Sequence, residues 1–356
     1  MTSLSAAPPV EPPERPVGRR TLRLVDPGRA DRVLLVDVWY PATIAGEPLT
    51  RYEPIPSIVF ESASAHDEPS VRPTPAGFGR YPLILLSHGR TGMRFAYSLL
   101  SEALAARGFI VVASDHPGDA LNDWLSGTFV DDRTNETGRV GDFGFLLDTL
   151  LAGGTKSSSD LAVGMPLDLL AAIDPDRVVA IGHSYGAYTG LAAAAGVRGV
   201  APDVRLKAVV GIQAYTRSMS DAALSRVKVP TLLVISEFDQ TTPAATDGDR
   251  PWQQLNGNPT WRMDLAGAAH HASSDMGLYL ELATKIQGLP PMVTAYVAMM
   301  SGETTGSHIR PWRHGLLLQI RAIAAFLDIV LPLDPAKGEA EAERLAATDG
   351  VQLQRR

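Results

Sequence analysis

The five residues Gly182-His183-Ser184-Tyr185-Gly186 constrain the fold more than any other stretch of the chain. They form a G-x-S-x-G pattern between an apolar run at 177–181, which predicts a buried strand, and an Ala-rich run at 187–195, which predicts a helix. So tight a strand–turn–helix connection needs small residues two positions away from the serine on each side. The serine hydroxyl then lies at a helix N-terminus, where backbone dipoles favour a developing negative charge. We therefore expect Ser184 to be a nucleophile, and an ordinary turn serine is the alternative.

Apolar runs alternate with helical patterns along most of the chain. Continuous apolar strands separated by helices predict a mostly parallel sheet covered by helices on both faces, which is the α/β class. The chain has 356 residues, enough for one large domain of this kind. The predicted strands are 83–87, 109–114, 177–181, 206–212, 231–236 and 261–265, and the predicted helices are 94–107, 141–151, 187–195 and 309–331.

Other segments fall outside this alternation. Residues 1–20 contain five prolines and predict a disordered lead-in, a hairpin is predicted at 21–40, and residues 41–80 predict an irregular excursion rich in Pro, Ser and Gly. We expect a single domain over 21–332 and a charged, partly loosely packed tail at 333–356. Insertions that form lids and substrate walls over the strand C-termini are expected near 116–138, 153–168 and 276–308, with plain surface loops as the alternative.

The composition excludes several kinds of site. The chain has no cysteine, which excludes disulfides, thiolate metal sites and a cysteine nucleophile. The net charge is −7 and the basic residues form no stripe, so no nucleic-acid partner is expected. No apolar run approaches the length of a membrane span, and residues 1–20 have no apolar signal-peptide core. A cytoplasmic location is therefore expected, or a secreted one if a leader was trimmed; the residues favour neither a monomer nor an oligomer.

A serine hydroxyl needs a base, an orienting acid and an oxyanion hole before it can attack an ester. In proteins whose serine lies on such a strand–turn–helix connection, the acid follows a later strand in the chain and the histidine follows the strand after that. The loop after the fifth predicted strand contains Asp239, which we prefer, and Glu237; a turn-capping role is the alternative for Asp239. The loop after the sixth contains His270, which we prefer over the adjacent His271 because neighbouring side chains point in different directions.

Backbone and pocket residues are predicted around this set. Ser87–Gly92 contains two glycines that let a main chain approach a substrate, so we expect the N–H groups of Arg90 and Tyr185 to form the oxyanion hole. An ordinary glycine turn is the alternative for this loop. Adjacent histidines converge poorly on one ion and no zinc-binding spacing is present, so neither a metal nor a cofactor is expected. The candidate pocket-lining side chains, for which plain packing is the alternative, are Met93, His116, Trp124 and Met276.

Five stretches resemble a known family: VDVWYPAT at 36–43, LLSHGRTGMRFAYSLLSEALAARGFIVVASDHPGDA at 85–120, DFGFLLDTL at 142–150, VVAIGHSYGAYTG at 178–190 and AGAAHHASSDM at 266–276. Together they resemble the α/β-hydrolase superfamily, and more narrowly the plasma/type II platelet-activating-factor acetylhydrolase group with its bacterial predicted dienelactone hydrolase relatives. The resemblance implies the α/β-hydrolase fold, with Ser184 as nucleophile and His270 as base.

The chain departs from that family at the acid. Mammalian members place the acid after the strand that matches 206–212, where this chain reads Gly211-Ile212-Gln213-Ala214-Tyr215-Thr216 without a carboxylate. Asp239 stands at the position more usual for the superfamily and for cutinase-like polyester hydrolases. Phospholipid specificity therefore does not transfer directly. Dienelactone hydrolases themselves use a cysteine nucleophile, which this chain lacks.

The sequence predicts a serine carboxylic-ester hydrolase that acts through an acyl-enzyme, with Ser184, Asp239 and His270 as its triad. The expected partners are small-molecule or polymeric esters with short-to-medium acyl groups, including platelet-activating-factor-like phospholipids or polyesters. An acyltransferase on the same fold is one alternative, which product partitioning to an added alcohol would reveal. A non-catalytic binding member is the other, which would not react with a fluorophosphonate.

Overall fold

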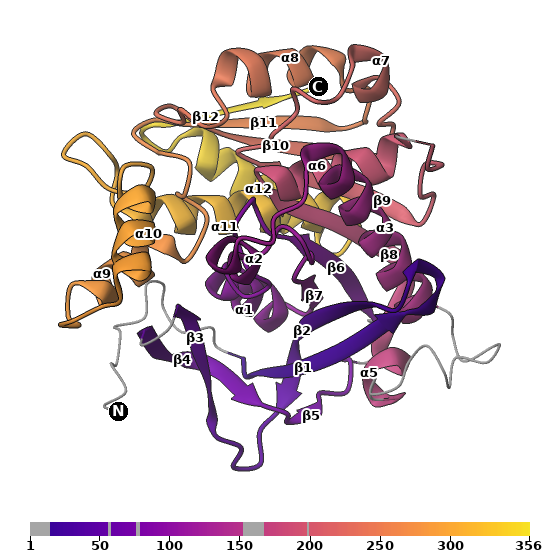
Figure 1. Ribbon diagram of the computed structural model, residues 1–356. Coiled ribbons are helices and arrows are strands. Elements are labelled where there is room, and N and C mark those ends of the chain that lie inside the picture. The colour runs from indigo at the N-terminus through magenta and orange to yellow at the C-terminus, as the bar shows by residue number, and fades with distance from the viewer. Residues whose placement is uncertain (1–14, 56–57, 76–78, 152–166, 198) are drawn as a thin grey trace.

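The centre of the fold is a sheet of parallel strands that is buried on both faces (Figure 1). A computed structural model describes residues 15–55, 58–75, 79–151, 167–197 and 199–356. Within these ranges twelve strands form one sheet in the order β12-β11-β10-β9-β8-β6-β7-β2-β1-β4-β3, with β5 paired to β2. The parallel strands are β6 (Tyr81–Ser87), β7 (Ile110–Ser114), β8 (Ile173–His183), β9 (Leu206–Ile212), β10 (Thr231–Ser236) and β11 (Thr260–Leu265).

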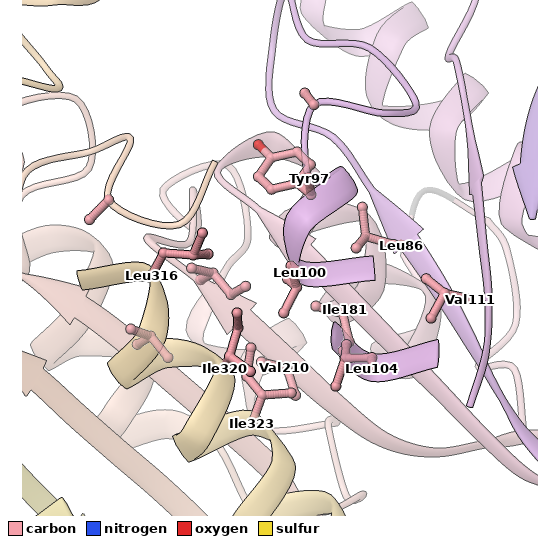
Figure 2. Packing of buried hydrophobic residues seen from close by; sticks show 14 of the residues in the cluster. Leu86, Tyr97, Leu100, Leu104, Val111, Ile181, Val210, Leu316, Ile320 and Ile323 are labelled. Atoms are coloured by element: carbon pink, nitrogen blue, oxygen red, sulfur yellow. The ribbon is translucent and has the colours of Figure 1, made fainter. Parts of the chain in front are cut away.

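Helices cover both faces of this sheet, because successive apolar side chains of each strand point to opposite sides. Ile84 and Leu86 belong to one buried cluster with side chains of α1 (Ser98–Ala106) and α11 (Trp312–Val330), and Figure 2 shows Leu100 of α1 between Leu86 and Ile320 of α11. Leu83 and Leu85 pack on the other face with α3 (Asp132–Leu151) and α6 (Tyr185–Ala195). The predicted α/β class, with a mostly parallel sheet between two helical layers, is confirmed.

Helix α1 is shorter than the predicted helix at 94–107. Its first two backbone N–H groups, those of Ser98 and Leu99, donate to the carboxylate of Asp275, at 2.7 and 3.4 Å. This distant side chain caps the helix at Ser98, so the four residues before it form turns. The predicted C-terminal glycine is present: Gly108 has φ of +106° and follows the last helical turn.

The N-terminal region contains more sheet than predicted. β1 (Val17–Asp26) begins inside the expected lead-in at 1–20, and residues 1–14 lie outside the described ranges. The expected irregular excursion at 41–80 is wrong, because it contains the end of β2 (Arg32–Thr43), β3 (Leu49–Ile55), β4 (Ile58–Asp67) and β5 (Ser70–Val71). Buried polar side chains hid this pattern: Ser62 and Ser64 of β4 donate to the buried carboxylate of Glu102, at 2.8 and 2.6 Å.

The expected loose tail at 333–356 is also wrong. It forms α12 (Pro335–Ala346), which packs on α11, and β12 (Val351–Arg355), which adds an antiparallel edge strand to β11. Gly338 allows the close contact between the two helices, because a Cβ there would lie 2.7 Å from the Ala325 carbonyl oxygen. The domain therefore continues past the predicted boundary at residue 332.

The expected insertions carry the remaining helices. Residues 116–138 contain α2 (Leu121–Ser126) and the start of α3, and residues 276–308 contain α9 (Met276–Ala283) and α10 (Pro291–Ser301). Of the insertion at 153–168, only Leu167 and Asp168 lie within the described ranges. The other elements are η1 (Pro27–Arg29), α5 (Leu167–Ala172), α7 (Asp221–Leu224), η2 (Ala244–Gly248) and α8 (Asp249–Gln254).

Candidate active site

Ser184 occupies a strained turn between β8 and α6. Its φ of 54° and ψ of −119° lie in a region that side chains rarely adopt and that costs about 1–3 kcal/mol. Backbone hydrogen bonds hold this conformation: Ser184 N–H donates to Ile212 O at 3.0 Å, and Ser184 O accepts from Tyr215 N–H at 3.1 Å. Ser184 is therefore held as the single residue that connects β8 to α6.

The two glycines of the G-x-S-x-G pattern are required by packing. A Cβ on Gly182 would lie 2.1 Å from the Gly186 carbonyl carbon, and a Cβ on Gly186 would lie 1.9 Å from the Ser87 carbonyl oxygen. Parallel pairing of β6 with β8 sets Ser87 beside Gly182. The turn and the loop after β6 therefore lie in direct backbone contact, which only glycine at these positions permits.

Asp239 and His270 form a buried pair on the loops after β10 and β11. His270 Nδ1 donates to Asp239 Oδ2 at 2.8 Å, and both residues are less than a tenth exposed. Thr242 also donates to this carboxylate, through its N–H and its hydroxyl, each at 2.7 Å. Burial opposes the charge of Asp239, but the hydrogen bonds from His270 and Thr242 prevail and hold the pKa of this carboxyl below its usual value. Since Nδ1 faces Asp239, Nε2 is the nitrogen left for a reacting group.

The alternative residues for these two positions have other contacts. Glu237 is exposed and accepts from the Gly267 N–H at 2.8 Å, so it closes the loop that precedes His270. The backbone N–H of His271 donates to Glu303 O at 3.0 Å. Burial, followed by the neighbouring His270, lowers the pKa of His271 well below its usual value. His271 is therefore a neutral imidazole beside the pair.

One cavity brings most of the predicted residues together, although Asp239 and Tyr185 are not in its lining. It has a volume of about 260 Å³, and its lining includes Ser184, His270 and Arg90. Three of the four predicted pocket residues line it as well, namely Met93, Trp124 and Met276. Lining residues that the sequence did not single out are Ala96, Tyr97, Thr241, Ser274, Tyr279, Tyr296, Met299, Met300 and Glu303. Many of these come from 276–308, so the position of that insertion was the signal for them.

The fourth predicted pocket residue, His116, is not part of the cavity lining. It is fully buried, with Nδ1 2.9 Å from Asp142 Oδ2 and Nε2 2.8 Å from Ser87 Oγ. Its place at the end of β7 suggested exposure to substrate. The ring instead points into the protein beneath the loop after β6.

A second histidine supports His270 from below. Tyr97 Oη lies 2.7 Å from His183 Nδ1, and His183 Nε2 lies 2.7 Å from the His270 carbonyl oxygen. Burial, followed by the charge of His270, lowers the pKa of His183 well below its usual value, so the ring is neutral. A neutral ring that donates from Nε2 accepts at Nδ1 from the tyrosine hydroxyl. This series of hydrogen bonds from Tyr97 through His183 fixes the backbone of His270.

Two backbone N–H groups near Ser184 are left without an acceptor. Within the part of the chain that the structure describes, the N–H groups of Arg90 and Tyr185 make no hydrogen bond. Tyr185 is the first residue of α6, where helix geometry leaves the N–H groups without an intrahelical partner. These are the two groups that the sequence assigned to an oxyanion hole.

The described ranges contain neither a metal-binding cluster nor a membrane-spanning helix. No group of three or more His, Asp or Glu side chains there is arranged to hold a metal ion. No helix in the same ranges has the length and apolarity to cross a membrane.

The chain is similar to known hydrolases in sequence and in fold. A model of the Alpha/beta hydrolase family matches residues 83–335. Platelet-activating factor acetylhydrolase from Canis lupus familiaris is 28% identical over 189 residues, which cover 44% of this chain and 40% of that protein. The same enzyme from Bos taurus is 26% identical over 188 residues, with the same coverage. The match thus spans about two fifths of the length of these curated relatives, and it confirms the expected resemblance.

A solved structure extends the similarity to nearly the whole chain. A ferulic acid esterase from Streptomyces cinnamoneus has a TM-score of 0.63 and 23% sequence identity, and the match covers 92% of this chain and 93% of that one. At this identity the likeness establishes the fold. With the family model matching most of the sequence, the chain belongs to the alpha/beta hydrolase family.

Proposed function

We propose that the protein is a serine carboxylic-ester hydrolase. The observation that carries the proposal is the His270 imidazole, bound at 2.8 Å to the buried Asp239 and lining the same cavity as Ser184. A base that is oriented by an acid, in the same cavity as a serine on a strained turn, is the arrangement that activates a hydroxyl. The similarity to platelet-activating factor acetylhydrolases supports ester hydrolysis as the reaction.

The proposed reaction has two proton-balanced halves. Ser184 Oγ attacks the ester carbonyl carbon while its proton moves to His270 Nε2. The tetrahedral intermediate then collapses, the imidazolium gives the proton to the leaving alcohol, and an acyl ester remains on Ser184. Water repeats the sequence, releases the acid and restores Ser184. Asp239 holds the imidazole tautomer and stabilises the imidazolium.

The oxyanion of both intermediates would be bound by the free N–H groups of Arg90 and Tyr185. One belongs to the residue after the nucleophile and the other to the loop after β6, which contacts the turn at Gly186. Donors of this kind act on the charge that develops in the transition state. No metal or cofactor enters the proposed reaction.

Replacing Asp239 by alanine is expected to lower kcat by about 10⁴-fold, because the imidazole would lose its orienting acceptor. The matched change Glu237→Ala is expected to leave kcat within about threefold, since the one hydrogen bond of this carboxylate within the described residues is to the Gly267 N–H. Both are measured as p-nitrophenyl acetate hydrolysis. A larger loss in Glu237→Ala than in Asp239→Ala would move the acid to Glu237.

The proposed substrates are esters with short-to-medium acyl groups, including platelet-activating-factor-like phospholipids and polyester ends. The cavity walls are largely apolar, and about 260 Å³ is small beside the roughly 300–1,000 Å³ of typical ligand pockets. Trp124 and Tyr296 close it with a ring contact at 5.7 Å between centroids. The acyl group would fill this space.

A series of p-nitrophenyl esters of increasing acyl length tests this class. kcat/KM is expected to rise about fourfold per buried CH₂ until the cavity is full, and then to fall. Trp124→Ala is expected to move the optimum to longer chains. If the acyl length with the highest kcat/KM is the same in Trp124→Ala as in the wild type, the assignment of this cavity to the acyl group is contradicted. A lysophospholipid analogue and a polyester film in the same series distinguish the two extended substrates.

A further inference from the structure

A fully buried polar network lies beneath the loop that carries Arg90. Its members are Ser87, His88, His116, Arg139 and Asp142, all at 0% relative exposure. None of them lines the cavity. The network therefore does not touch substrate, and whatever it contributes to the reaction passes through the backbone of the loop.

The backbone in question is the peptide unit between Gly89 and Arg90. A peptide unit is planar and trans, so its carbonyl and its N–H point in opposite directions. Three donors converge on the Gly89 carbonyl oxygen: His88 Nδ1 at 2.7 Å, the Gly92 N–H at 3.1 Å and Arg139 Nη2 at 3.4 Å. Holding the carbonyl in this way fixes the direction of the Arg90 N–H.

The ring of His88 has only one tautomer that satisfies its contacts. Its Nε2 accepts from the His116 backbone N–H at 3.2 Å, so the hydrogen is on Nδ1 and is donated to Gly89 O. Burial, followed by the positive charge of Arg139, lowers the pKa of His88 well below its usual value. His88 is therefore a neutral, single-tautomer donor to the loop.

Arg139 reaches the loop from α3. Its Nη1 donates to His88 O at 2.7 Å, while Nε and Nη2 donate to Asp119 Oδ2 at 2.9 and 2.6 Å. The guanidinium also lies 5.8 Å from the centre of the Tyr185 ring. A planar fork with several donors can hold two successive carbonyls and one carboxylate at once, which a lysine ammonium cannot.

On its other side Arg139 contacts Ser87, which is the first member of a hydrogen-bonded chain through His116 to Asp142. His116 donates to Asp142, and Ser87 Oγ donates to His116 Nε2, which leaves Ser87 Oγ free to accept from Arg139 Nη1 at 3.2 Å. Burial and the charge of Arg139 lower the pKa of His116 to about 4, so this ring is also neutral near pH 7. The set has the residue types of a second triad, but the buried Ser87 hydroxyl has no path to an ester.

We propose that Arg139, together with His88, is a positioning residue that aims the Arg90 N–H at the oxyanion. The inference rests on the proposed function and deepens it. It assigns the alignment of this donor to α3 and to the buried polar network, rather than to the loop alone.

The test measures oxyanion binding in Arg139→Met and Arg139→Lys. Ser184 Oγ adds to the carbonyl carbon of a trifluoromethyl ketone while the Ser184 hydroxyl proton moves to His270. The carbonyl oxygen of the ketone then becomes an anion. Arg139→Met is expected to lower kcat and ketone affinity by the same factor, about 10- to 100-fold, with KM within about twofold. Arg139→Lys keeps the pair with Asp119 and is expected to lose about 10-fold in both. If Arg139→Met does not fold, the result for Arg139→Lys decides the test.

Arg19→Met is the matched control. It removes a guanidinium from strand β1 that is largely buried, with its side chain 11% exposed against 0% for Arg139, and that is paired with Asp37 at 2.7 Å. We expect a lower Tm but unchanged kcat and ketone affinity. Ketone affinity at the wild-type level in the Arg139 variants, or an equal loss in Arg19→Met, overturns the inference.

Ser184→Ala separates this inference from the proposed function. Loss of hydrolysis and of ketone binding in that variant supports the proposed function, whatever the Arg139 variants do. Retained hydrolysis in Ser184→Ala overturns the proposed function and the inference with it. Ser184-dependent hydrolysis with unimpaired Arg139 variants overturns the inference alone.

Discussion

Ser184→Ala is expected to lower kcat for p-nitrophenyl acetate by about five to six orders of magnitude. The variant keeps the cavity and the Asp239–His270 pair but has no oxygen to form the acyl-enzyme. The N–H groups of Arg90 and Tyr185 remain, so a small rate above that in water is expected to persist. KM is expected to change little, since the Ser184 hydroxyl contributes mainly to the transition state.

Ser114→Ala is the matched control for this loss. Ser114 is a fully buried serine at the end of β7, and within the described ranges its hydroxyl has no hydrogen-bond partner. Removing that oxygen is expected to leave kcat unchanged. Turnover near the wild-type level in Ser184→Ala would reject the nucleophile assignment.

His270→Ala is expected to lose about as much as Ser184→Ala, because residues that act as one unit give similar losses when either is removed. His271→Ala is expected to keep kcat within about tenfold. The two residues are adjacent in sequence, yet only His270 has its ring nitrogen on Asp239, at 2.8 Å. The Nδ1 of His271 lies 3.5 Å from Ser274 Oγ.

The kcat values of the two variants are compared at saturating ester concentration, and circular dichroism verifies that both variants fold. Each histidine contributes a buried ring that packs on His183, at 5.6 Å between centroids for His271 and 4.5 Å for His270, so a lower Tm is expected for both variants. An inactive His271→Ala beside an active His270→Ala would exchange the two roles.

The centre of the fold was predictable because its strands have a simple pattern. β9 and β10 match the predicted ranges, since each contains a short apolar run, 208–212 and 232–235, that is buried on both faces. The edges were not predictable in this way. β4 buries Ser62 and Ser64 against Glu102, and β12 depends on pairing with β11, from which it is separated in sequence by the helices α9 to α12.

The site divides along the same line. Ser184, Asp239 and His270 each follow a clear strand, so chain order was enough to choose them, and the structure places Asp239 and His270 in contact. Arg139 and Asp142 are on a helix with many polar residues, and nothing local in sequence indicates that they face inward. His116 follows a strand like the others, but its partners Ser87 and Asp142 draw it away from the cavity.

Labelling with a fluorophosphonate tests the central claim most directly. The reagent forms a bond between phosphorus and an activated serine oxygen and releases fluoride, so the adduct identifies the nucleophile by peptide mass. We predict one adduct per chain, on Ser184, that disappears in Ser184→Ala and forms far more slowly in His270→Ala. An unlabelled wild-type protein, or an adduct on another serine, would contradict the account.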